Sequence, residues 1–288
     1  MLVVDKPSGP TSHDIVARVR KHYGTRHVGH AGTLDPMASG VLVVLVGEAC
    51  KLASYLTLAN KLYRASVSFG VATDSLDADG ERVAEAVLAP GWLDAARLEA
   101  ALAHERARSE QVPPAVSAIQ IGGVRAHRSA RSGAPLCLPP RPVKVHGLSV
   151  LRWSDSELQL ELGVSKGYYV RALARDLGEA LGVPAHLNAL RRLASGPFSL
   201  AESTAWPLDA SPHLLDLAAA ARRSLPSTHL TAEGERRARL GQRLAPSDFT
   251  EPVEPEGVSA WLSVDERLVA LGAPADGASY RVVRGFRA

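Results

Sequence analysis

The sequence predicts an α/β (α+β) domain with a small β-barrel appended at its C-terminus. The chain has 288 residues, which is long for one domain and comfortable for two. Apolar strand-like runs and amphipathic helical patterns share the first part of the chain, whereas the last part holds short strand-like runs separated by turn residues. We therefore expect two domains, residues 1–228 and residues 229–288.

The composition excludes several classes of protein. Hydrophobic residues make up 46% of the chain, and 33 Lys and Arg against 30 Asp and Glu leave a net charge of only +3. That balance excludes a histone-like or tail-driven nucleic-acid binder, although a local basic surface would still bind nucleic acid. The two cysteines, Cys50 and Cys137, form no CxxC pair, so zinc ribbons and redox dithiols are not expected.

The N-terminus predicts neither a signal peptide nor a membrane anchor. The opening residues MLVVDKPSGP contain a charge pair and a proline, which interrupt any apolar signal region. The longest purely aliphatic run, VLVVLV at 41–46, is far too short to span a membrane. We expect a soluble, cytoplasmic protein, and the low cysteine content agrees with a reducing compartment.

The N-terminal segment predicts a strand, a basic helix, a glycine-rich loop and a buried strand. Residues 2–4 form the first strand, and Ser12 is expected to cap a helix with apolar residues on one face. The loop GHAGTLDPMASG (29–40) leads into the run 41–46, whose continuous aliphatic pattern predicts a strand covered on both faces. A helix is expected at 52–58. The polar side of the first helix and its exit carry Arg18, Arg20, Lys21, His22, Arg26 and His27.

The central part predicts further strands and helices. Alternating apolar and polar residues at 63–69 indicate a half-buried strand, and DSLDADGE (74–81) is typical of an acidic turn. Asp94 is expected to cap a helix, and 113–131 predicts a strand, a Gly-Gly turn and a short arginine-bearing helix. Further strands are expected at 143–153 and 158–164, and further helices at 169–181, ending at Gly182, and at 185–193.

The C-terminal part predicts only short strands after a linker. Pro226 to Thr228 is the expected linker. The strand-like runs that follow it are RRARLGQRL (236–244), AWLSVDERLVALG (260–272) and SYRVVRG (279–285).

Asp35, within the loop 29–40, could serve the turn alone. An Asp-Pro pair is typical of a turn start, and an aspartate also caps backbone N–H groups. The glycines at 29, 32 and 40 fit neither a Walker loop nor a GxGxxG dinucleotide motif. His27 and His30 lie near Asp35 but lack a clear third ligand, so we expect no metal site.

The segment SKGYYVRAL (165–173) favours a chemical role for Asp35. It places a lysine, two tyrosines and Arg171 where a strand passes into a helix, although a solvated basic turn with aromatic packing would also explain it. Arg171 lies two residues into the helix, where the macrodipole gives a cation no stabilisation. A partner carboxylate would explain this position, and pairing with Asp35 would keep the acid ionised and oriented.

Several segments resemble the motifs of one enzyme family, and they occur in the family's order. They are LVVDKPSGPTSHDIV (2–16), GHAGTLDPMASGVLVVLVGEACK (29–51), LYRASVSFGVATDSLDADG (62–80), PPAVSAIQIGGVRAHRSAR (113–131), SKGYYVRALARDLGEALG (165–182) and HLNALRRLASGPF (186–198). The chain thus resembles the bacterial tRNA pseudouridine-55 synthases, the TruB family. The resemblance implies a pseudouridine synthase fold, with a large mixed, mostly antiparallel sheet flanked by helices and a small PUA-like β-barrel, which the C-terminal residues match only loosely.

The resemblance also implies roles for individual residues. Asp35 is expected to be the catalytic aspartate and Arg171 its ion-pair partner. Tyr63 would stack on the target base and take part in proton transfer, and Tyr169 and Leu190 would line the pocket. His30 would help to hold the T-loop of tRNA with its base flipped out.

The chemistry agrees with these residue types. Pseudouridine formation breaks the N1–C1′ bond, rotates the uracil and joins C5 to C1′, so no redox cofactor is needed. One carboxylate nucleophile can start it, at C1′ or at C6 of the ring, once the base has left its stack. No cofactor, metal or obligate protein partner is expected, and the family expectation is a monomer acting on the T-arm of tRNA.

Two basic segments are candidates for contacts with tRNA phosphates. They contribute Arg18, Arg20, Lys21, Arg125, His127, Arg128 and Arg131. The family often has lysine where Gln120 stands and tyrosine where His127 stands, which affects the expected RNA contacts rather than the reaction.

Two alternatives stay open at this point. The chain could be an RNA-binding or tRNA-folding protein without essential catalysis, although a buried ion pair beneath a stacking tyrosine has no use in a pure binder. It could also be a related synthase that acts on ribosomal RNA or inside a guide-RNA particle.

Overall fold

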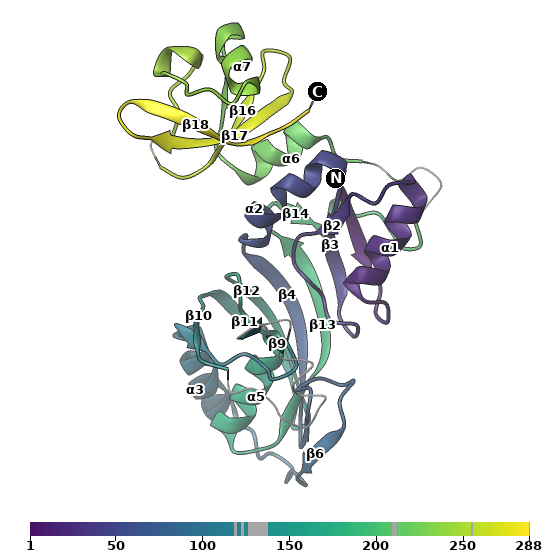
Figure 1. Ribbon diagram of the computed structural model, residues 1–288. Helices are drawn as coiled ribbons and strands as arrows, with labels where there is room; N and C mark the ends of the chain where they lie inside the picture. The colour runs from purple at the N-terminus through teal and green to yellow at the C-terminus, as the bar shows by residue number, and fades with distance from the viewer. Residues whose placement is uncertain are drawn as a thin grey trace.

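The main feature of the computed structural model is one large twisted sheet (Figure 1). The structure describes residues 1–117, 120–121, 124–125, 138–208, 212, 214–254 and 256–287. The sheet has the order β1-β3-β13-β4-β12-β11, with β2 paired to β3 and β14 paired to β13. These strands are β1 (Leu2–Lys6), β2 (Val28–His30), β3 (Ser39–Val46), β4 (Lys61–Phe69), β11 (Val145–Trp153), β12 (Glu157–Val164), β13 (Ala185–Ser195) and β14 (Phe198–Ser199).

Smaller elements surround this sheet and form the C-terminal part. The helices are α1 (Ser12–Tyr23), η1 (Gly47–Leu52), α2 (Ala53–Thr57), α3 (Ala95–Arg106), α5 (Val170–Leu181), η2 (Leu200–Glu202), α6 (Leu217–Ser224), α7 (Ala232–Arg239) and η3 (Pro246–Asp248). The short strands are β5 (Val71–Thr73), β6 (Arg82–Glu85), β7 (Glu110–Gln111), β8 (Gln120–Ile121), β9 (Val124–Arg125) and β10 (Arg141–Pro142). The C-terminal strands are β15 (Ser227–His229), β16 (Ser259–Leu262), β17 (Leu268–Ala275) and β18 (Ser279–Gly285).

The large sheet is mixed and mostly antiparallel, as expected. Its one parallel contact among the described strands joins β13 to β3, where Arg191 pairs with Ser39 and Arg192 with Gly40. All other neighbours in it are antiparallel. The parallel contact brings the C-terminal half of β13 beside the end of the glycine-rich loop, which matters for the site described below.

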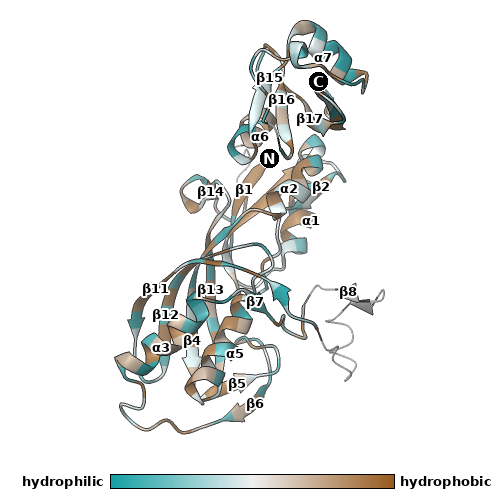
Figure 2. Ribbon diagram, turned by 90° about the vertical axis from the view of Figure 1, so that its left-hand side faces the viewer, coloured by the Kyte–Doolittle hydropathy of each residue, from teal (hydrophilic) through white to brown (hydrophobic). Residues whose placement is uncertain are grey.

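The run 41–46 is buried on both faces, which confirms the prediction for this strand. Leu42 and Val44 pack with the helices α1, α3 and α5, whereas Val41, Val43 and Leu45 face the α2, α6 and C-terminal side. Side chains that alternate along a strand point to opposite faces, so only a strand sandwiched between two layers needs apolar residues throughout. In Figure 2 the neighbouring strand β1 is likewise coloured as hydrophobic.

The prediction of a helix at 185–193 is wrong, because this segment is the central strand β13. The strand pairs with β4 along its length, and its register shifts between Leu187 and Ala189, which leaves Asn188 as an extra residue. Because of the bulge, Leu187 and Leu190 are both buried although they are three positions apart in the sequence, a spacing that is typical of a helix. Pairing on both sides overrides the helical pattern of the isolated sequence.

The C-terminal sheet is present, with strand order β15-β16-β17-β18. Its described strands form an open path, which isolated bridges such as Leu244 to Tyr280 extend, and no closed ring of strands is described. Two local predictions are wrong. The expected linker runs into β15, which begins at Ser227, and the segment expected as a strand at 236–244 begins with the last turn of helix α7, residues 236–239. Thr231 caps α7, and Arg–Glu pairs at i,i+4 spacing stabilise the helix over the residues whose pattern predicted a strand.

The two parts of the chain share a hydrophobic cluster. It joins Val43 and Leu45 of β3 to Ala218 of α6, Leu262 of β16 and Phe286 after β18. Residues on both sides of position 228 therefore pack together, and the domain boundary placed there stays a prediction.

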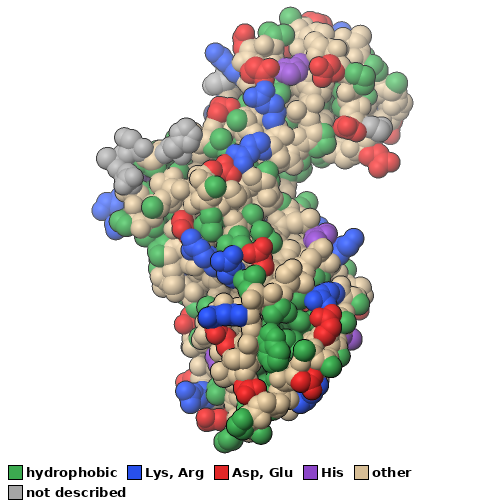
Figure 3. All heavy atoms as spheres, turned by 180° about the vertical axis from the view of Figure 1, so that it is seen from behind, with side chains coloured by type: hydrophobic (Ala, Val, Ile, Leu, Met, Phe, Trp, Pro, Cys, Tyr) green, Lys and Arg blue, Asp and Glu red, His purple; other side chains and the backbone are tan. Residues whose placement is uncertain are grey.

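Other local predictions can be compared directly. The first helix is capped by Thr11 rather than Ser12, in a capping box with Asp14, and Asp94 caps α3 as expected. The glycine turn and the arginine-bearing helix expected within 113–131 fall largely outside the described residues. No described helix is long and apolar enough to cross a membrane. The face in Figure 3 carries basic and acidic side chains in scattered groups, as the balanced composition suggests.

Candidate active site

A cleft of about 810 Å³ opens beside the large sheet. Its lining comes from the start of α1, the loop 32–36, strand β4, the acidic turn 74–81, the loop 165–169 and the first turn of α5. Asp35, Tyr63, Tyr169, Arg171 and Leu190 all line it. The structure therefore brings together five of the six residues that were predicted to act on the substrate.

The loop that carries Asp35 is held rigidly from three directions. The Ser12 hydroxyl accepts from Leu34 N at 2.9 Å and donates to Leu34 O at 3.1 Å. The Arg192 guanidinium donates to the carbonyls of Gly32 and Thr33 at 3.0 and 3.2 Å. Both Ser12 and Arg192 are buried, so these bonds compete little with water. The three residues before Asp35 are thereby fixed.

The third contact comes from Lys6, a fully buried residue of β1. Its ammonium donates to the carbonyls of Pro7, Pro10 and Pro36 at 2.8, 2.8 and 3.3 Å. Burial lowers the pKa of Lys6 to about 8, with Asp35 opposing that shift. Lys6 therefore stays mostly protonated at neutral pH and can serve as a donor to all three carbonyls.

Gly40 allows strand β13 to approach the end of the loop. Its φ of 104° lies in a region that side chains disfavour, and a Cβ there would overlap the Arg192 carbonyl oxygen. The parallel contact between β3 and β13 thus needs glycine at this position. It is the contact that carries Arg192 to the loop.

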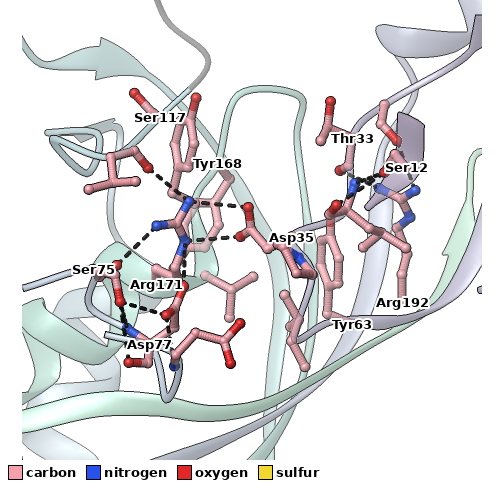
Figure 4. Close-up of a pocket in the computed structure, with 18 of the residues that line it drawn as sticks. Ser12, Thr33, Asp35, Tyr63, Ser75, Asp77, Ser117, Tyr168, Arg171 and Arg192 are labelled. Atoms are coloured by element: carbon pink, nitrogen blue, oxygen red, sulfur yellow. Dashed lines mark hydrogen bonds and ion pairs between the residues drawn. The ribbon is translucent and has the colours of Figure 1, made fainter. Parts of the chain in front are cut away.

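Asp35 and Arg171 form the predicted ion pair (Figure 4). Arg171 Nε lies 2.9 Å from Asp35 Oδ2, and Nη2 donates to Oδ1 at 3.2 Å. Arg171 is buried, whereas the Asp35 side chain keeps 33% of its surface exposed. The pair therefore fixes a carboxylate in the cleft wall while leaving it accessible to a bound molecule.

Arg171 has further partners that fix its own orientation. It donates to the carbonyls of Ser75 and Val116 at 2.9 and 3.0 Å. Its Nε also lies 3.5 Å from Oδ2 of Asp77, a second carboxylate that is itself buried. The planar guanidinium can bind these partners at the same time, because its donors point in fixed directions. It joins the loop of Asp35 to the acidic turn and to the segment before residue 118.

Asp77 is a site residue that the sequence analysis missed. Asp77 Oδ1 accepts from Ser75 Oγ at 2.6 Å and from Asp79 N at 3.2 Å, so the residue does serve the turn, as the composition of 74–81 suggested. The feature of the sequence that could have indicated Asp77 was the number of carboxylates in a short turn that follows the strand carrying Tyr63. Nothing in their spacing indicated which one would be buried against Arg171.

We expect Asp77→Asn to lower kcat roughly tenfold while leaving tRNA affinity unchanged. The amide keeps an acceptor for Ser75 but removes the negative charge beside Arg171, so the guanidinium is held less firmly toward Asp35. Single-turnover rates at saturating enzyme would measure the loss. Asp79→Asn is the matched control, since Asp79 is exposed in the same turn and should leave the rate unchanged. Equal rates for both variants and the wild type would contradict the prediction.

Tyr63, Leu190 and Tyr169 form the rest of the predicted pocket. Tyr63 on β4 and Leu190 on β13 are buried, with only small exposed surfaces, and both line the cleft. Tyr169 is the N-cap residue of α5, and its backbone is held on both sides by the Gln111 amide, at 2.8 Å through Tyr169 N and 3.2 Å through Tyr169 O. Burial raises the pKa of Tyr169, so its hydroxyl stays protonated.

A buried polar network lies behind the first turn of α5. The Tyr168 hydroxyl donates to Glu105 Oε1 at 2.6 Å, and Arg108 bridges Glu105 and Asp176 at 2.6 and 3.2 Å. Burial raises the pKa of Tyr168 well above 10, which keeps it a donor. The network joins α3 to α5 near the first turn of α5, which Tyr169 caps and which contains Arg171. It is a second feature that the sequence did not indicate.

We expect Glu105→Ala to lower the free energy of unfolding by about 3–5 kcal/mol. Glu105 is only 1% exposed, so its removal leaves the Tyr168 hydroxyl without its acceptor and leaves Arg108 short of one partner. Urea unfolding would measure the change. Glu99→Ala is the control on the same helix, because the Glu99 side chain is 63% exposed and its ion pair with Arg106 should be worth less than about 1 kcal/mol. A Glu105 variant as stable as the Glu99 variant would contradict the prediction.

His30 is the one predicted substrate residue that does not line the cleft itself. Its ring lies 5.5 Å from the ring of His13, centroid to centroid, in an edge-on arrangement, and His13 does line the cleft. Burial is the main cause that lowers the pKa of His30, with smaller electrostatic effects of His13 and Arg192, so the His30 imidazole is neutral at neutral pH. No cluster of three metal-ligating side chains occurs among the described residues.

The candidate RNA contacts divide into three groups. Arg18 and Lys21 are exposed on α1. Arg20 is also exposed but donates to Val28 O at 2.9 Å, so it has a structural task too. The other candidates lie in the segment 120–131. The structure describes the backbone of β8 and β9 but not their side chains, so it does not describe the contacts of Gln120 and Arg125. His127, Arg128 and Arg131 lie outside the described residues.

Solved structures of known proteins share this fold. The chain aligns over its whole length with 84% of a chain in an H/ACA RNP bound to a substrate RNA containing 2′-deoxyuridine, at a TM-score of 0.74 and 23% identity. A Cbf5-Nop10-Gar1 complex gives the same TM-score at 24% identity, over 99% of this chain and 84% of that one. At this identity the similarity establishes the pseudouridine synthase fold alone.

Sequence comparisons establish the family. Residues 20–170 match the N-terminal domain of the TruB family pseudouridylate synthases, and residues 171–230 match the C-terminal domain of tRNA pseudouridylate synthase B. The tRNA pseudouridine synthase B of Mycobacteroides abscessus is 42% identical over 94% of this chain and 91% of its own length, and that of Nocardia farcinica is 45% identical over 94% and 88%. The chain that builds this cleft around Asp35 and Arg171 therefore belongs to the TruB family of pseudouridylate synthases.

Proposed function

We propose that the protein is a tRNA pseudouridine synthase that isomerises uridine 55 in the T-loop of tRNA to pseudouridine. The observation that carries this proposal is the accessible Asp35 carboxylate held by the buried Arg171 in the wall of a cleft that Tyr63 also lines. Relatives more than 40% identical over nearly the whole chain are tRNA pseudouridine synthases B, which supports the same reaction and substrate class.

In this proposal Asp35 is the nucleophile. The target uridine leaves its stack and enters the cleft, where Tyr63, Tyr169 and Leu190 enclose the base. Asp35 attacks C1′ or C6, the N1–C1′ bond breaks, and the uracil rotates. C5 then joins C1′, the bond to Asp35 breaks and releases the carboxylate, and N1 takes up a proton. The proton on C5 then leaves, and proton transfer is the second role that we assign to Tyr63. The uridine is isomerised without gain or loss of electrons, so the reaction needs no redox cofactor.

The remaining residues bind and position the RNA. We assign His30, through its contact with His13 at the edge of the cleft, to holding the T-loop in its flipped form. Arg18, Lys21 and the basic segment 125–131 would contact phosphates, and residues 229–288 would form a PUA-like RNA-binding domain beside a catalytic domain of residues 1–228. We propose a monomer that acts on the T-arm without an obligate protein partner, in the cytoplasm, where tRNA is available.

Tritium release tests the proposal. A tRNA transcript labelled with tritium at C5 of its uridines should release tritium on incubation with the protein, because C5 loses its hydrogen when it bonds to C1′. Replacing uridine 55 by cytidine in the same transcript should abolish release. Equal release from both transcripts would assign the enzyme to another uridine, and no release from either would refute the reaction.

A further inference from the structure

Two segments that line the active-site cleft carry opposite charge. One is the acidic turn 74–81, next to the β5–β6 hairpin, and the other is the loop 165–169, next to β10 and the ends of β11 and β12. Figures 1 and 2 both place the β5–β6 hairpin at the end of the molecule farthest from the C-terminal sheet. Asp35 and Arg171 lie on the cleft wall along with both of these segments.

Three exposed cations border the loop 165–169, and we call Arg141, Lys144 and Lys166 the cation rim. Lys166 lies between Ser165 and Gly167, which both line the cleft. Lys144 is fixed beside it, because Lys144 N donates to Ser165 Oγ at 2.8 Å and Ser165 N donates to Lys144 O at 2.9 Å. Arg141 pairs across the β7–β10 ladder with Gln111, whose amide holds Tyr169, and its charge acts on the Tyr169 hydroxyl.

The cation rim is unneutralised within the described part of the chain. None of its three side chains forms an ion pair there, whereas most exposed arginines of α3, α6 and α7 are paired with carboxylates. Cations that converge from three separate segments without carboxylate partners create a local positive potential, even in a protein of net charge +3.

The acidic turn, by contrast, carries unpaired carboxylates. Asp74, Asp79 and Glu81 are exposed and line the cleft, and none of them forms an ion pair with a described residue. Asp74 does accept a hydrogen bond from Glu81 N at 2.9 Å, which shapes the turn. An RNA strand that lay with its phosphates along this turn would meet like charges at short range.

We propose that the cation rim is a phosphate-binding subsite for the RNA strand in the cleft, and that the carboxylates of the acidic turn keep phosphates away from their own part of the cleft. The inference rests on the proposed function and deepens it by setting how the RNA lies. Phosphates next to the flipped uridine bind Arg141, Lys144 and Lys166, the base reaches Asp35, and the strand leaves the cleft without following residues 74–81.

Salt-dependent binding tests the cation rim. In the Asp35→Asn full-length chain, Lys144→Ala/Lys166→Ala should weaken tRNA binding about tenfold and reduce the slope of log K against log salt by roughly 1.4 to 1.8, the counterion release expected for two phosphate contacts. Arg152→Ala is the control, since Arg152 is exposed at the far end of β11. Wild-type affinity and slope in the double variant would overturn the proposal.

The acidic turn gives a test of opposite sign. Asp79→Asn/Glu81→Gln should tighten tRNA binding two- to threefold, a change of roughly 0.5 kcal/mol, because like-charge repulsion is removed. Weaker binding would show that these carboxylates contact the RNA and would overturn their assigned role. Failure of the inference is distinguishable from failure of the proposed function: tritium release by the wild type reports the reaction, whereas these affinities are measured without turnover.

Discussion

Asp35→Asn should reduce tritium release from C5-labelled tRNA by at least about 1,000-fold. Asparagine has the size of aspartate and keeps one oxygen that can accept from Arg171, but it is not a nucleophile. The loop should keep its shape, because Ser12, Lys6 and Arg192 hold it through its backbone and not through the Asp35 side chain. The loss should therefore appear in the chemical step and not in folding.

Two measurements distinguish a loss of the chemical step from a loss of folding or of tRNA binding. The melting temperature of the Asp35→Asn protein should stay within a few degrees of the wild type, and its tRNA affinity within roughly threefold, since a partly exposed side chain is replaced by a neutral isostere. Normal turnover by the variant would sink the assignment of the nucleophile. Retained promotion of tRNA folding in native gels, with turnover lost, would show that the two activities coexist.

The ion pair at the centre of the site could be predicted from the sequence because two separate local features indicated it. Asp35 is the single carboxylate of the loop 29–40, and Arg171 lies in the first turn of a helix, where a cation gains nothing from the dipole. The strand 41–46 was equally predictable, since an uninterrupted aliphatic run of that length is explained by burial on both faces.

The parts that could not be predicted depend on pairing across the sheet. The sequence of β13 has a helical pattern, because the bulge at Asn188 separates its buried residues by three positions instead of two. The bulge becomes evident only from the pairing of β13 with its neighbours β3 and β4. Asp77 and Arg192 were missed for a related reason. Both are buried polar residues whose partners are backbone groups and side chains far along the chain, and no local pattern encodes those distances.

Arg171→Ala should lower kcat at least about 100-fold while tRNA affinity stays within roughly tenfold. Without the guanidinium, Asp35 and Asp77 are left facing each other across a buried space, so Asp35 loses both its orientation and its counterion. The variant should also lose about 3–5 kcal/mol of stability, because a buried charge network is broken. Rates must therefore be measured well below its melting temperature.

Arg171→Lys distinguishes positioning from charge alone. Lysine supplies the same charge, but a single ammonium cannot span Asp35, the Ser75 carbonyl and the Val116 carbonyl at once. If Arg171 acts by geometry, lysine should recover stability more than rate, and kcat should stay at least about tenfold below the wild type. Full recovery of kcat by lysine would mean that any nearby cation suffices. Lost affinity with unchanged kcat in the alanine variant would instead move Arg171 to the RNA-binding surface, and Asp35 would then need another residue to hold it in the cleft.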